Sequence, residues 1–132
     1  MTKSAGSIFV TAMVSGNFAV TLWHLHILQN VHPMESGGES FTLGSIVGSV
    51  SLFAILLIWT RFYKVGAWIS AGLLLIGLTI GSYEHFLSVN PNNVFIMPHG
   101  DWTLSFQISA VLLVVVELLG IWAAVRTATL RA

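Results

Sequence analysis

Residues 103–125 read TLSFQISAVLLVVVELLGIWAAV, and Glu117 is the only charged side chain in this run. A helix that crosses the hydrocarbon core of a bilayer, about 30 Å thick, needs roughly 20 mainly apolar residues. Three other segments meet this requirement, at about residues 7–29, 43–60 and 66–86. The sequence therefore predicts an all-α membrane protein with four transmembrane helices in an antiparallel bundle, forming a single domain over residues 1–132.

The composition of the chain supports the same class of protein. Hydrophobic residues make up 55% of the sequence and charged residues only 8%, whereas a soluble domain usually carries about 25% charged residues. A soluble fold with so few charges would expose a large apolar surface to water. The zero net charge gives no reason to expect a nucleic-acid partner, and the absence of cysteine excludes disulfides and thiolate metal sites.

The positive charges predict how the chain is oriented in the membrane. All five lysines and arginines precede the first span, follow the fourth, or lie between the second and third: Lys3, Arg61, Lys64, Arg126 and Arg131. The positive-inside rule therefore places both termini in the cytoplasm. Trp23 and Trp102 fall near the predicted outer interface, and Trp59, Trp68 and Trp122 near the inner one. We expect a multi-pass protein of the cell membrane, in contact with the lipid bilayer.

Small and polar residues predict where the helices touch. Glycines four residues apart, Gly44 with Gly48 and Gly77 with Gly81, suggest close-packing faces, either within the chain or against another subunit. The first span carries two polar stripes on opposite sides, one with Asn17, Thr21 and His24, the other with Thr11, Ser15, Ala19 and His26. A helix contacted from both sides favours self-association or insertion into a larger membrane complex.

The ionisable residues of the outer half predict a metal or haem site. All five histidines map there: His24, His26, His32, His85 and His99. Because they lie in predicted helix, His24, His26, Glu84 and His85 are the candidate metal ligands, and Glu84 is expected to point into the bundle. Imidazole and carboxylate bind copper, zinc or iron, and His24 and His85 could alternatively hold a b-type haem across the first and third spans. The competing interpretation is that these side chains only form hydrogen bonds at the membrane interface.

Glu117 and Asn17 are the polar residues expected at the centre of the membrane. A carboxyl group at this depth is expected to be neutral, because burial disfavours its charged form. It could serve a proton relay or an ion site, or it could simply form a hydrogen bond across a helix interface to Asn17 or Ser15. A contact with another subunit would also explain it.

Three functions are compatible with this pattern. The favoured one is a small, non-catalytic accessory subunit of a larger respiratory or oxidising membrane complex, since the loops are too short to build a catalytic domain and no phosphate-binding or nucleophile motif is present. The second is a haem- or copper-binding membrane protein of electron transport. The third is an oligomeric proton or ion transporter that uses Glu117.

Overall fold

The computed structural model describes residues 3–31, 37–97 and 99–130, without the side chains of residues 3 and 37–44. Within these ranges the chain is helical and contains no strand. The helices are α1 (Lys3–Val31), α2 (Gly37–Ile58), α3 (Tyr63–Ser82) and α4 (Thr103–Ala128), and a π-helical turn, η1 (Tyr83–Leu87), continues α3. The four predicted helical segments are confirmed, with ends that differ from the prediction by a few residues.

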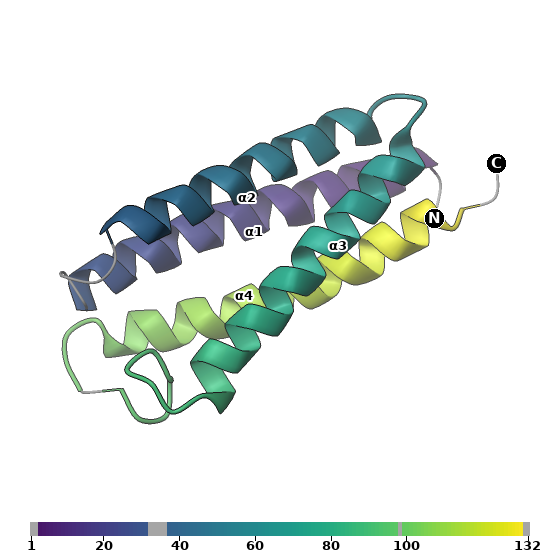
Figure 1. The fold of residues 1–132 in the computed structure, drawn as a ribbon. Coiled ribbons are helices and arrows are strands. Elements are labelled where there is room, and N and C mark those ends of the chain that lie inside the picture. Colours follow the sequence, from purple (N-terminus) through teal and green to yellow (C-terminus); the bar gives the residue numbers. More distant parts are fainter. Residues whose placement is uncertain (1–2, 32–36, 98, 131–132) are drawn as a thin grey trace.

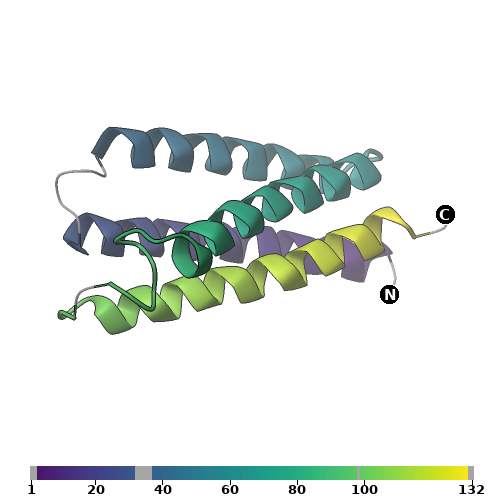
Figure 2. The ribbon, with the colours of Figure 1, turned by 60° about the horizontal axis from the view of Figure 1, so that its bottom comes forward.

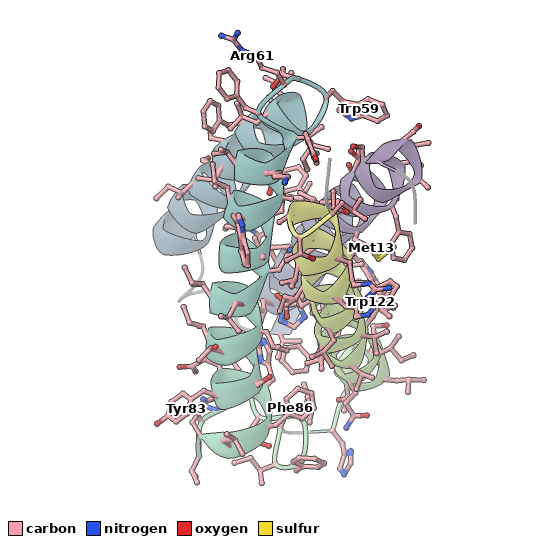
Figure 3. All side chains as sticks on the ribbon, turned by 90° about the vertical axis from the view of Figure 1, so that its right-hand side faces the viewer. Met13, Trp59, Arg61, Tyr83, Phe86 and Trp122 are labelled. Carbon is pink, nitrogen blue, oxygen red and sulfur yellow. The ribbon has the colours of Figure 1, made fainter. Side chains whose placement is uncertain are left out.

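Successive helices run in opposite directions, so the ends of the bundle differ (Figure 1). The beginning of α1, the end of α4 and the α2–α3 turn share one end, and η1 and the α3–α4 connection lie at the other. Arg61, Lys64 and Arg126 belong to the first end, and Figure 3 places Arg61 and Trp59 opposite Tyr83 and Phe86. These three described positive side chains therefore gather at one end, while which side of a membrane this end faces stays a prediction.

Three of the helices are long and apolar enough to cross a membrane. These segments are Ser4–Val31, Tyr63–Leu87 and Thr103–Ala128. The described apolar part of α2, Ser45–Ile58, is shorter than a full span, so a fourth crossing stays a prediction. Large hydrophobic side chains such as Leu52, Leu75 and Leu118 are exposed on these helices, as lipid-facing surfaces require.

Helices α1, α3 and α4 pack against one another through small residues. A Cβ atom added at Gly120 of α4 would lie 2.6 Å from Leu74 Cδ1 of α3 and 3.3 Å from Met13 Cβ of α1. Helix α2 meets α3 in the same way near their turn, where a Cβ at Gly66 would lie 2.7 Å from the Ala54 carbonyl oxygen. In lipid the hydrophobic effect does not drive helices together, so close van der Waals contact of this kind stabilises the packing instead.

Two of the four glycines in the predicted close-packing faces contact a side chain of another helix in this chain. Gly48 lies against the Phe18 ring, with 2.9 Å between Cε2 and an added Cβ, and Gly77 lies against the Glu117 carboxylate. For Gly81 the nearest atom belongs to His85 in the next turn, and the side-chain position of Gly44 lies outside the described part.

Candidate functional site

Two histidines predicted to face each other, His24 and His85, meet inside the end of the bundle opposite Arg61. Their ring centroids are 4.7 Å apart and the rings lie at 66° to each other. Phe106 of α4 packs against both, at 4.9 Å from the His24 centroid and 5.4 Å from the His85 centroid. Only 4% of His24 and 9% of His85 are exposed. Helices α1 and α4 and the turn η1 thus enclose a histidine pair.

Each histidine is oriented by an oxygen atom through its Nδ1. His24 Nδ1 lies 2.8 Å from Ser109 Oγ on α4, and His85 Nδ1 lies 3.1 Å from the Asn92 carbonyl oxygen in the α3–α4 connection. His24 Nε2 is buried and has no hydrogen-bond partner. The pair is therefore held from one side of each ring, while the other nitrogen of His24 lacks a partner.

His85, and not Glu84, is the buried side chain of the π-helical turn η1. In this turn the Ser88 amide bonds to the Tyr83 carbonyl, 2.8 Å away and five residues earlier, which widens the helix relative to an α-helix. At about 100° per residue Glu84 shares the face of Gly77 and Ser70, whereas His85 shares the face of the buried Ala67 and Leu74. In the structure His85 is buried instead, and the Glu84 carboxylate accepts a 2.9 Å hydrogen bond from Asn90. The expectation that Glu84 points into the bundle is therefore wrong.

The other predicted ligands do not join the histidine pair. His26 is exposed on α1, with its ring 6.0 Å from the Trp102 ring. His99 is exposed beyond η1, and His32 lies outside the described residues. In the part of the chain that the structure describes, no group of three or more histidine, aspartate or glutamate side chains could hold a metal ion. Of the four predicted metal ligands, His24 and His85 are the two whose rings meet inside the bundle.

The histidine pair does not fit the predicted b-type haem. With metal–nitrogen bonds of about 2 Å, an iron between two axial imidazoles would hold their centroids roughly 6 Å apart, with the macrocycle between the rings. His24 and His85 are closer than this and touch edge to face. Phe106 contacts both rings, so the flat slot that a haem needs is filled.

Glu117 and Asn17 form a second buried polar layer, nearer the middle of the bundle. Both side chains are 5% exposed. A Cβ at Gly16 would lie 4.0 Å from Val116 Cγ1, so this part of α1 lies level with this part of α4. Glu117 Oε1 points at Gly77 of α3, where a Cβ would collide with it. Asn17 Oδ1 is buried without a hydrogen-bond partner, so the predicted bond between Glu117 and this oxygen is not formed.

A groove runs between α1 and α2 on the outside of the bundle. Its volume is about 900 Å³, and all of its lining residues belong to these two helices. Polar side chains contribute to the lining: Ser15, His26, Gln29, Ser45, Ser49 and Ser51. The second polar stripe predicted on the first span supplies Ser15 and His26, whereas the first stripe supplies buried Asn17 and His24. Span one therefore has a polar surface on both sides, as predicted.

Sequence reasoning missed Ser109, Phe106 and Asn92 at the histidine pair and Ser51 at the groove. Ser109 lies seven residues, about 10 Å, after the interfacial Trp102, whereas His24 directly follows Trp23. Predicted depth in the membrane therefore gave no signal for Ser109. No signal pointed to Asn92, because its carbonyl reaches His85 only through the fold of the connection.

Comparison with known proteins finds no match for this chain. No protein-family model matches the sequence, and neither the curated proteins nor the solved structures provide a match. The proposed function therefore rests on the geometry of the candidate sites.

Proposed function

We propose that this chain is a small, non-catalytic accessory subunit of a larger membrane complex, such as a respiratory or oxidising assembly. It would bind a transmembrane helix of another subunit in the groove between α1 and α2. The observation that carries the proposal is the lining of this groove. Ser15, Ser45 and Ser49 are exposed there, on the faces of two apolar helices.

The groove also contains a buried hydroxyl without a partner. Ser51 is 4% exposed, lines the groove, and its Oγ makes no hydrogen bond. Lipid tails offer no donor or acceptor, so a polar atom at this depth is satisfied by protein or ordered water. Serines and glycines let helix backbones approach closely in membranes, and serine hydroxyls bond across helices. A helix of another subunit can pack closely against the exposed Ser45 and Ser49 and bond to their hydroxyls, whereas an acyl chain offers them no hydrogen bond.

The test is site-specific photo-crosslinking in native membranes followed by mass spectrometry of the crosslinked product. A photoreactive residue replaces exposed Ser49 in the groove, and a matched one replaces exposed Thr79 on α3, whose hydroxyl bonds to the Leu75 carbonyl of its own helix. We expect one defined membrane polypeptide to crosslink at Ser49 and not at Thr79, and the same polypeptide to co-purify in mild detergent.

A blocking substitution provides the second arm. Ser49→Phe fills the groove and should release the partner, whereas Thr79→Phe adds the same ring to a surface outside the groove and should leave the partner bound. Crosslinks only to lipid, equal crosslinking at both positions, or a product formed by a second copy of this chain would contradict the accessory-subunit proposal.

A further inference from the structure

We propose that His24 and His85 bind a single copper(I) ion through their Nε2 atoms. The proposal concerns the interior of the bundle and does not depend on a partner in the groove. It rests on three features of the pair: the tautomer that each histidine adopts, the unpartnered nitrogen of His24, and the absence of a third histidine, aspartate or glutamate ligand among the described residues.

The hydrogen bonds around His24 determine its tautomer. Ser109 Oγ donates its hydrogen to the Phe106 carbonyl oxygen, 2.9 Å away. A hydroxyl has one hydrogen to donate, so Ser109 Oγ must act as the acceptor toward His24 Nδ1, at 2.8 Å. The proton of neutral His24 is therefore on Nδ1, and its Nε2 carries a lone pair.

His85 adopts the same tautomer for a simpler reason. Its Nδ1 faces the Asn92 carbonyl oxygen at 3.1 Å, and a carbonyl oxygen can only accept. The proton of neutral His85 is therefore also on Nδ1, and Nε2 is again the nitrogen with the lone pair. Histidines that bind metals commonly donate their second ring N–H to a protein oxygen, which orients the ring and makes the free nitrogen a better ligand.

The free nitrogen of His24 makes no hydrogen bond within the described part of the chain. Its Nε2 is buried without a hydrogen-bond partner, and a buried polar atom left in this state costs about 1–3 kcal/mol. An ion about 2 Å from each Nε2 would lie roughly 3 Å from each ring centroid. The observed separation of 4.7 Å between the centroids therefore suits one ion held at a bent angle by both rings.

The surroundings favour a singly charged, soft ion. Structural zinc sites use four ligands, and no third histidine, aspartate or glutamate joins the pair among the described residues. The carboxylate of Glu84, which accepts a hydrogen bond from Asn90, supplies a single negative charge near His85, and burying any further uncompensated charge is costly. Copper(I) carries one charge and accepts two or three ligands. The Met97 thioether is buried in the cluster that contains Phe106, and such sulfur ligands select copper(I).

The experiment is a copper(I) titration of the purified full chain in detergent, under reducing and oxygen-free conditions, against a chromophoric copper(I) chelator. Wild-type protein should take up about one equivalent, and His24→Gln and His85→Gln should each weaken binding at least about tenfold. His26→Gln is the matched control, since His26 is exposed and faces Trp102, and it should bind as wild type does. Ser109→Ala, which removes the oxygen that orients His24, should weaken binding about 10-fold or more.

A measurement on the unaltered chain covers the case in which a histidine variant does not fold. With ¹⁵N-labelled histidine, copper(I) should shift the Nε2 resonances of two of the five histidines and leave their Nδ1 nitrogens protonated. The proposal is overturned if wild-type protein takes up no copper(I), if the His24→Gln and His85→Gln variants retain it, or if the shifted resonances belong to exposed histidines. Tighter binding of zinc(II) than of copper(I) would overturn the choice of ion.

Discussion

Helices α4 and α2 are both apolar, yet they pack very differently. Buried residues occur along almost the whole of α4, from Phe106 to Ala128. Among the described side chains of α2 only Ser51, Ala54 and Ile58 are buried, all in its second half, and the groove separates α2 from α1. Figure 2 shows α4 close to α1 and α3, whereas α2 approaches α3 only toward their connecting turn and its beginning is set apart from the other helices.

The difference teaches that apolarity does not indicate burial in a protein of this class. Lipid accepts apolar side chains as readily as the protein interior does, so small and polar residues determine where helices meet. Helix α4 presents Ser109, Ala110, Gly120 and Ala124 to its neighbours, and these are all buried. Helix α2 presents Ser45 and Ser49 outward, which is the reason for placing a partner there.

The largest effect is expected where α2 is attached to α3. Gly66→Ala would put a Cβ 2.7 Å from the Ala54 oxygen and the Ile58 nitrogen. Both are backbone atoms and cannot turn aside, so we expect a loss of about 3 kcal/mol of unfolding free energy, measured by denaturant titration in detergent. Gly72→Ala is the control, since nothing lies within 4 Å of its added Cβ. Equal stability of the two variants would mean that α2 is not anchored at Gly66.

The second-largest loss of stability is expected at the contact between α3 and α4 at the centre of the bundle. Gly77→Ala would collide with the Glu117 carboxylate, and we expect a loss of about 2 kcal/mol. In a Glu117→Ala background the same substitution should be much less harmful, because the colliding group is gone. A double-mutant cycle should show a coupling of about 1–2 kcal/mol. A coupling near zero would contradict the placement of Glu117 against Gly77.

Two buried serines should respond in opposite ways. Ser109→Ala removes the acceptor of His24 Nδ1 and should reduce the unfolding free energy of the isolated chain by about 1 kcal/mol, because a buried donor loses its partner. Ser51 Oγ makes no hydrogen bond, so Ser51→Ala should leave the isolated chain unchanged or slightly more stable. A marked destabilisation by Ser51→Ala would show that its hydroxyl is already satisfied without a second subunit.

The smallest effect is expected at the edge of the α1–α2 contact. Trp59, which directly follows α2, donates through Nε1 to Thr11 Oγ1 of α1 over 3.1 Å. Trp59→Phe keeps an aromatic ring and removes this bond, and hydrogen bonds between membrane helices are worth about 0.6 kcal/mol on average. Thermal unfolding with Trp122→Phe as the comparison should resolve it. A loss several times larger would mean that α2 depends on this link more than on Gly66.

The sequence predicted the helices well because their signal is local. Apolar length and helix-breaking residues set the four segments, and equal depth near the interface brought His24 and His85 together as candidates. The sequence failed at η1, because the bond from Ser88 to Tyr83 depends on how the following connection folds. Glu84 was assigned to the inward face because it follows Gly77 and Ser70, whereas the buried Ala67 and Leu74 of the same helix point to His85.

The arrangement of helices was only partly predictable. The two polar stripes of the first span correctly indicated two polar surfaces, one inside the bundle and one toward the groove. The width of the groove depends on how side chains such as Phe18 meet Gly48 of the facing helix, which no spacing along one helix reveals. The tautomers of the histidines depend on Ser109 and Asn92, whose approach is likewise a property of the folded chain.

The connection after η1 also affects how the protein adapts to bilayer thickness. Two carbonyls of η1 are bonded by the chain that follows: the Glu84 oxygen accepts from Asn90 Nδ2 at 3.1 Å, and the His85 oxygen accepts from the Val94 amide at 2.9 Å. A helix end normally needs water or a cap for these groups. Since the chain itself supplies donors for these two carbonyls, they stay bonded when this end of the helix lies below the headgroups. Hydrophobic mismatch in a thicker bilayer should therefore cost this end of α3 little.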